Sequence, residues 1–256
     1  MPEPAASKPV RAASRGARPG PRAARPDERS AGTEERAART VERLLDTAER
    51  LFAERGIAAV SLREIVLGSG QRNPSAAHYH FGSRDALVGA VVTRRIALIN
   101  ATRHVALDAL GAAGDVRAIL AASVGALASH VEHSPWGGAY AQITAEMALH
   151  PEIAAQARVD PQAMSSLART NAMLRAALPG VPAALVRRRG LACNAITVTT
   201  IARWLRLHGP VSDANADAFW AEVGALCDLL APGFGAGVGA SGVPDQCRGP
   251  ARPGVA

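Results

Sequence analysis

The sequence has few cysteines, and their arrangement excludes the sites that cysteines usually build. The chain has three cysteines, Cys193, Cys227 and Cys247. This is an odd number, and they lie too far apart to have the spacing of a zinc site or a redox pair. Reduced thiols of this kind are typical of a reducing compartment. We therefore expect no disulfide framework and no metal held by cysteine.

Long apolar runs are also missing. The sequence has no apolar stretch of about 18 residues, which is roughly what a membrane-spanning helix needs. Residues 1–33 do not contain the apolar segment of a secretory signal. Together with the cysteine pattern, these absences predict a cytoplasmic protein with no membrane partner.

Aromatic residues and strand patterns are scarce as well. Aromatic residues make up 4% of the chain, and no segment alternates apolar and polar residues as a half-buried strand does. Alanine is abundant and favours helix. Between residues 33 and 231 apolar residues recur at helical spacing, with Gly and Pro breaks that separate about nine helices. The sequence predicts an all-α fold.

Both ends of the chain lack this helical pattern. Residues 1–32 are rich in Arg, Pro and Ala, and residues 232–256 are rich in Gly and Pro, so we expect two disordered tails. Residues 1–32 hold seven basic and three acidic residues, which gives +4 of the total net charge of +7. This tail is either only solvated or an arm that attracts phosphates without sequence preference, and both can hold at once.

The residues from 61 to 87 have the pattern of two short helices joined by a turn. Ser61 followed by Glu64 forms a capping box, which predicts a helix start. Gly68 and Gly70 end that helix, and Asn73-Pro74 begins the next one, with Asn as N-cap and Pro at the first position. This geometry is a helix-turn-helix, whose second helix can lie in the major groove of DNA.

The flanking residues make the pattern more specific. The stretch ERLLDTAERLFAERGIAAVSLREI, followed by HYHFGSRDALVGAV, resembles the DNA-binding region of the TetR family of transcriptional regulators. The resemblance covers about residues 36–92; beyond it, the chain is similar to the family in helical character and length. It implies a helix-turn-helix domain over residues 33–82 and an effector-binding and dimerisation domain over residues 83–231.

The resemblance also implies which residues meet DNA. Between Ile65 and Tyr79 this chain is about two residues longer than the usual family pattern, and the link at 68–72 absorbs the difference. By position, the residues expected at bases are Ser75 and Ala77, and those expected at phosphates are Tyr79, His80 and Arg84. Arg72 is a further candidate because a guanidinium can clamp phosphate or guanine. With the neighbouring side chains, the predicted DNA-binding set is Arg72, Asn73, Ser75, Ala77, His78, Tyr79, His80 and Arg84. For each of them a plain surface or packing role is the alternative.

The larger domain should hold an effector pocket and a dimer interface. Polar or aromatic residues on otherwise apolar faces are candidate pocket walls, although filling the core is the alternative for each. These are Trp136, Tyr140, Met147, Asn171 and Asn194. The helix over 182–208 is apolar on more than one face, and TetR-family dimers use their last two helices. The predicted interface residues are Ile201, Trp204, Leu205, Phe219, Val223 and Leu226, with a monomer core as the alternative.

A metal site is the main rival to the effector pocket. His130 and His133, and likewise Glu146 and His150, each share a helix face, so that each pair could supply two ligands. Nothing in the sequence brings the pairs together, and no nucleophile elbow, phosphate loop or HExxH motif is present. We expect no metal, no cofactor and no enzymatic activity.

The leading interpretation is a homodimeric transcriptional repressor. It would bind a pseudo-palindromic operator in double-stranded DNA and release it when a small-molecule effector binds. Two alternatives stay open. One is a metal-dependent helical enzyme built on the two His and Glu pairs. The other is a DNA-architectural protein that uses the Arg-rich tail without effector control.

Overall fold

The computed structural model describes residues 26–71, 73, 75–111, 114–157 and 159–235, with side chains from residue 34 onward. Contacts divide the chain into two compact units, residues 1–39 and residues 40–256. The first unit contributes a helical segment on which Arg39 and Glu35 form an exposed ion pair one turn apart. The features that bear on function lie in the second unit.

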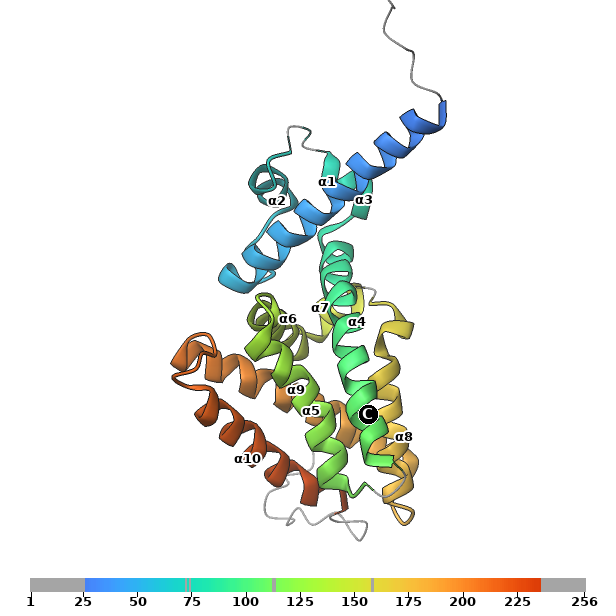
Figure 1. Cartoon of the computed structure of the whole chain (residues 1–256), viewed down its shortest axis with the longest axis vertical. Helices are drawn as coiled ribbons and strands as arrows, with labels where there is room; N and C mark the ends of the chain where they lie inside the picture. Colours follow the sequence, from blue (N-terminus) through green and yellow to red (C-terminus); the bar gives the residue numbers. More distant parts are fainter. Residues whose placement is uncertain (1–25, 72, 74, 112–113, 158, 236–256) are drawn as a thin grey trace, which may run out of the picture. The chain divides into compact units, whose positions relative to one another are not determined.

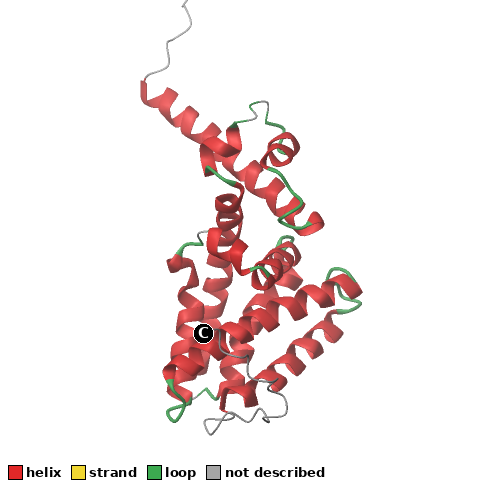
Figure 2. Cartoon of the chain, turned by 180° about the vertical axis from the view of Figure 1, so that it is seen from behind, coloured by secondary structure: helices red, strands yellow, loops and turns green. Residues whose placement is uncertain are grey.

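All regular structure among the described residues is helical (Figure 2). The helices, labelled as in Figure 1, are α1 (Pro26–Arg55), α2 (Leu62–Gly68), α3 (Ala76–Phe81), α4 (Arg84–Leu110), α5 (Val116–His133), α6 (Gly137–Leu149), α7 (Pro151–Gln156), the 3-10 helix η2 (Pro161–Met164), α8 (Ser165–Ala177), α9 (Ala183–His208) and α10 (Ala216–Gly235). The predicted all-α fold is confirmed. None of these helices is both long enough and apolar enough to cross a membrane.

Two predicted helix ends are wrong. Helix α1 begins at Pro26 and not at Thr33, in keeping with the preference of Pro for the first turn of a helix. Helix α10 continues past residue 231 to Gly235, although Pro232 lies within it. Phe234 is 2% exposed, so burial of its ring holds the last turn against the body. The remainder of the two predicted tails, residues 1–25 and 236–256, lies outside the described residues.

The local signals around α2 act as predicted. Ser61 Oγ accepts from the Glu64 amide at 3.3 Å, and Glu64 Oε2 accepts from the Ser61 amide at 2.9 Å. The amide and hydroxyl of Ser61, together with Arg55, lower the pKa of Glu64 to about 2. At the other end, Gly68 lies so close to α1 that a Cβ there would meet Thr47 Cγ2 at 2.9 Å, and Gly70 has φ +72°. The sequence therefore fixes both ends of α2 locally.

The helices of the second unit bury two hydrophobic clusters, a main one and a smaller one around Leu107, Leu174 and Phe234. Helix α6 packs along α9, α4 along α5, and α10 against α5. The main core cluster runs from Leu44 in α1 to Cys227 in α10 without a break. The predicted division into domains at residue 82 is therefore not marked by a gap in the core, and it stays a prediction about function.

The predicted dimer residues lie inside the single chain. Five of the six are 6% exposed or less: Ile201, Trp204, Phe219, Val223 and Leu226. The sixth, Leu205, is half-buried. Helices α9 and α10 turn these residues towards α5 and α6 of their own chain. This corrects the prediction, because the most apolar face of each helix is covered without a partner.

Candidate functional site

The recognition helix α3 is shorter than predicted. It begins at Ala76 instead of Pro74, and its N-cap, Ser75, makes no side-chain hydrogen bond to the helix. Asn73 is not the N-cap; its Oδ1 accepts from the Ser75 amide at 3.0 Å, in the turn that precedes the helix. The start of the helix is thus shifted to Ala76.

The residues predicted to meet DNA divide into three groups. Asn73, Ser75, His78 and Tyr79 are exposed, and Tyr79, at 84%, is the most exposed large hydrophobic side chain among the described residues. His80 and Arg84 are half-buried. Ala77 was expected at the bases but is 1% exposed and packs in the core, because α3 turns Ala76 and Ala77 inwards. Arg72 lies outside the described residues.

The outward face of α3 is built on a short row of rings. The ring of Tyr79 stands edge-on to that of His80, with the centroids 5.1 Å apart, and His80 lies edge-on to Phe81 at 6.4 Å. Phe81 packs against the main core cluster. The row therefore connects the exposed hydroxyl of Tyr79 to the core, which limits the rotamers of a side chain that could otherwise move freely.

Arg84 is held against the head at the start of α4. Its Nη1 donates to the Ala58 carbonyl oxygen at 3.3 Å, and its Nε lies 3.5 Å from Asp85 Oδ1. Ser83 Oγ caps the helix by accepting from the Ala86 amide at 3.1 Å. A phosphate at this helix start would meet Arg84 in a fixed orientation.

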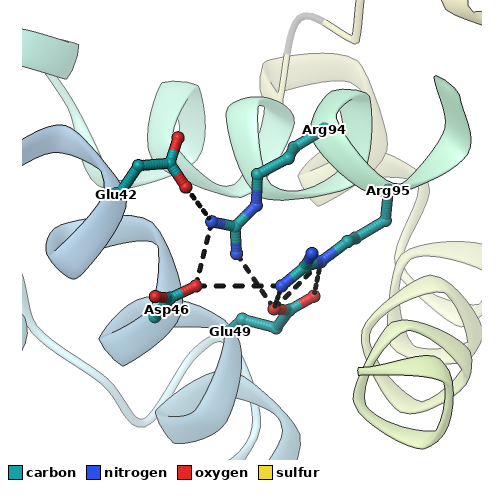
Figure 3. A network of polar contacts seen from close by, with 5 residues as sticks. All are labelled: Glu42, Asp46, Glu49, Arg94 and Arg95. Carbon is teal, nitrogen blue, oxygen red and sulfur yellow. Dashed lines mark hydrogen bonds and ion pairs between the residues drawn. The ribbon is translucent and has the colours of Figure 1, made fainter. Parts of the chain in front are cut away.

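An ion-pair network joins α1 to α4 (Figure 3). Glu49 is 4% exposed, and its carboxylate accepts from Arg95 Nε at 2.8 Å and from Arg94 Nη2 at 3.0 Å. Arg94 Nη1 lies 2.9 Å from both Glu42 and Asp46. We call these five residues the α1–α4 network. Three carboxylates face two guanidinium groups, so the charges of both arginines are neutralised.

A second connection ties the end of α1 to α6. The Ile57 amide, just after α1, donates to both carboxylate oxygens of Glu146 at 2.9 Å. Nearby, the guanidinium of Arg95 lies over the ring of Trp136, 5.0 Å from its centroid. Helix α1, which packs with the residues predicted to meet DNA, is thus fastened to α4 and α6.

The five predicted effector residues do not share one cavity. Trp136 lines a cavity of about 780 Å³ between α1, the α5–α6 loop and the end of α9. Asn171 and Asn194 line another, of about 40 Å³, between α4, α5, α8, α9 and α10. Tyr140 and Met147 are 5% and 9% exposed and belong to the main core cluster. For these two residues the core alternative is correct.

The four candidate metal ligands have separate partners. His130 lies 2.9 Å from Thr102 Oγ1, and His133 lies 2.9 Å from the carbonyl oxygen of Ser129. Glu146 is held by Ile57, and His150 lies 3.1 Å from Glu152. In the part of the chain that the structure describes, no three His, Cys, Asp or Glu side chains come together as a metal site. The geometry gives the metal-dependent enzyme no support.

Sequence reasoning missed the charged residues inside the fold. Glu49 lies on the apolar stripe of α1, next to Ala48 and one turn before Phe52. Arg103 occupies the buried face of α4 one turn after Ile99 and one turn before Leu107. A charge at an apolar position of a helical repeat was the available signal, since such charges are rarely buried without a reason.

Comparisons with known proteins agree with this geometry. Residues 44–91 match the family model described as bacterial regulatory proteins, tetR family. A search of curated protein sequences finds no match. Among solved structures, the fatty acid degradation regulator FadR from Bacillus halodurans is 13% identical with a TM-score of 0.53, covering 75% of this chain and 94% of its own. A TetR-family regulator from Rhodococcus sp. is 18% identical with a TM-score of 0.52, covering 76% and 99%.

At these identities the solved structures show the fold, while the family model identifies the head. The matched segment runs from Leu44 in α1 to Val91 in α4, so it includes α2, α3 and the outward ring row. By this match, residues 44–91 resemble the bacterial regulatory proteins of the tetR family, and the match supports a DNA-binding regulator whose head is the helix-turn-helix of α2 and α3.

Proposed function

We propose that this DNA-binding regulator acts as a homodimeric repressor, which binds a pseudo-palindromic operator and is released by a small molecule. The observation that carries the DNA contact is the division of α3 into two faces. Ala76 and Ala77 anchor the helix in the core, while Ser75, His78 and Tyr79 point outwards. Side chains on the outer face of such a helix can reach base edges and phosphates.

The dimer surface that we propose is the outward face of α9 and α10. On α9 this face includes Ile196 and Leu207, which are 42% and 63% exposed, with Ala192 one turn before Ile196. On α10 it consists of Ala218, Ala221, Ala225 and Leu229 at helical spacing. Small residues allow two helices to approach closely, and exposed leucines supply apolar area to bury.

Release by an effector requires that the head respond to the body. The α1–α4 network and the Glu146–Ile57 contact are the connections that would transmit a shift of α4 or α6 to α1. An effector causes release only when it binds more tightly to the state in which the two heads do not fit the operator. Two heads that read successive major grooves lie about 34 Å apart.

Selection of bound sequences from random double-stranded DNA with the full chain tests this function. We expect enrichment of a pseudo-palindrome. Tyr79→Ala should weaken binding to that sequence about tenfold or more, because one lost contact costs roughly 1–3 kcal/mol. Tyr79→Phe is the matched control for the hydroxyl. Binding of Tyr79→Ala equal to that of the wild type would remove α3 from the interface.

The oligomeric state is tested by light scattering after gel filtration. Ile196→Arg and Leu229→Arg should each shift the mass from dimer to monomer, because each places a charge on an apolar contact. Val105→Arg changes a residue of α4 that is 70% exposed and should leave the dimer intact. A dimer that survives both substitutions on α9 and α10 would place the interface elsewhere.

A further inference from the structure

Arg103 of α4 is a buried cation with neutral partners. It is 5% exposed, its Nε donates to the Ser123 carbonyl oxygen at 3.0 Å, and its Nη1 donates to Ser166 Oγ at 2.7 Å. Within the described residues no carboxylate pairs with it. Burial lowers the pKa of Arg103 to about 10, from the usual value of a guanidinium. A buried charge without a counter-ion is unfavourable, so the site favours whatever supplies one.

The groups that accept hydrogen bonds from Arg103 belong to a network of uncharged side chains and carbonyl oxygens. None of these groups neutralises the charge of the guanidinium. Ser166 Oγ donates to Asn100 Oδ1, and Asn100 Nδ2 donates to the Ala163 carbonyl oxygen at 2.7 Å. Thr170 Oγ1 lies 2.9 Å from the Ser166 carbonyl oxygen. The guanidinium nitrogens engaged in these hydrogen bonds are Nε and Nη1.

A buried hydroxyl also lines the cavity of about 40 Å³ beside Arg103. Thr197 is 4% exposed, and its Oγ1 has no oxygen or nitrogen partner among the described residues. Its neighbour is the Cys193 thiol, a weak hydrogen-bonding group; burial raises the pKa of this thiol to about 11, and the Thr197 hydroxyl acts in the opposite direction. Asn171, which is half-buried, and Asn194, which is exposed, line the cavity as well.

Much of the remaining wall is apolar, although Ser123 and Thr170 also belong to it. The apolar lining residues include Leu120, Val124, Leu127, Leu167, Leu174 and Phe234. The volume of about 40 Å³ corresponds to roughly three water positions, or to a carboxylate with its first carbons. A ligand therefore has to be short, with an acceptor at one end and an apolar group at the other.

We propose that this cavity binds a small organic acid, a short aliphatic carboxylate whose two oxygens pair with Arg103. A carboxylate matches the planar guanidinium fork and accepts hydrogen bonds from Thr197 and the two carboxamides. An ammonium ion would be repelled by Arg103, and a neutral amide would leave the buried charge as it is. Binding itself does not depend on the proposed function; the regulatory consequence, operator release, rests on it.

Isothermal titration calorimetry with butyrate on the full chain tests the site. We expect saturable binding of one butyrate per chain, with butyramide and butylamine at least about tenfold weaker because only butyrate brings the counter-charge. Arg103→Met should abolish the preference for the acid over the amide. Comparable binding of butyrate and butyramide would overturn the proposal, and so would unchanged acid binding in Arg103→Met.

A second variant keeps the test informative even if Arg103→Met unfolds. Thr197→Val has nearly the same shape and removes a hydroxyl whose described neighbour is a weakly bonding thiol, so the fold should hold while butyrate binds several-fold more weakly. The matched control is Thr144→Val on α6, whose hydroxyl donates to the Tyr140 carbonyl oxygen at 2.8 Å and is not part of this cavity. Equal butyrate affinity in Thr197→Val and the wild type would contradict the proposed geometry.

Operator binding in the presence of butyrate separates this inference from the proposed function. Binding of the acid with release of the operator supports both. Binding without release supports the site and contradicts its regulatory role. A chain that recognises its operator and releases it for another small molecule, but binds neither acetate, butyrate nor hexanoate, keeps the proposed function and overturns the site.

Discussion

Helix α4 contains two sites where arginine charges are shielded from solvent. The two sites differ in whether carboxylates of the described residues neutralise these charges. Arg94 and Arg95 have side chains 17% and 15% exposed and face Glu42, Asp46 and Glu49 of α1. Arg103, further along the same helix, is more deeply buried and has only hydroxyl and carbonyl oxygens as acceptors. The first site is complete within the chain and holds two helices together, whereas the second has a charge that a ligand could neutralise.

The comparison shows how a structural ion-pair network differs from a site that can bind a ligand. In both sites the arginines donate hydrogen bonds to oxygen atoms, so hydrogen bonding alone does not distinguish the two sites. The difference lies in the counter-charge: removing a carboxylate from the first site creates a buried charge, while adding one to the second site removes it. Each prediction below removes or adds a charge at one of the two sites.

The largest effect is expected for Glu49→Gln. This change leaves Arg94 and Arg95 without their most deeply buried carboxylate and should lower the free energy of unfolding by about 2–4 kcal/mol. Urea denaturation measures it. Glu42→Gln removes a partner of Arg94 whose side chain is 62% exposed, and it should cost less than about 1 kcal/mol. Equal losses in the two variants would mean that burial does not set the strength of the α1–α4 network.

Arg103→Met should have a much smaller effect on stability. The change removes two hydrogen bonds but also a buried charge without a counter-ion, so the two contributions oppose each other and should cancel to within about 1 kcal/mol. The same urea denaturation measures it. A loss as large as that of Glu49→Gln would make Arg103 a structural residue, like Arg94 and Arg95.

The smallest effect is a change in the titration of His130. Burial lowers the pKa of His130 below its usual value, and the charge of Arg103 lowers it further. Because the folded pKa lies below the unfolded one, protonation of His130 opposes folding, and its contribution to stability falls as the pH drops through the usual histidine range. Butyrate bound at Arg103 should raise this pKa, as should Arg103→Met, and NMR titration measures both. A pKa that responds to neither would contradict the coupling of the two groups.

Much of the fold could be predicted from local sequence. The capping box at Ser61 and Glu64, the helix start at Ser83 and the stop at Gly70 are fixed by groups within a few residues of each other. The helix-turn-helix followed from such signals together with the resemblance over residues 36–92. One helix start was predicted less accurately: Asn73-Pro74 has the pattern of a helix start, but α3 begins at Ala76, with Ser75 as its N-cap.

The site residues show where local reasoning stops. Apolar residues of α9 and α10 were predicted at a dimer interface, and most of them fill the chain's own core instead. Periodicity gives the apolar face of a helix but does not tell whether that face meets the same chain or another one. Tyr140 and Met147 were misplaced for the same reason, and Ala77 because a one-residue rotation of α3 exchanges an exposed position for a buried one.

The sequence by itself determined the helices, their ends and the kind of head that they form, because capping and periodicity act over a few residues. Only the tertiary structure decided which charges meet. Glu49 pairs with Arg95 across 46 residues of sequence, and Arg103 reaches Ser166 across 63, and neither distance leaves a trace in a local pattern. Helix packing brought carboxylates to Arg94 and Arg95 and none of the described ones to Arg103. Because of that difference, the first site is a structural ion-pair network, and the second is a candidate ligand-binding site.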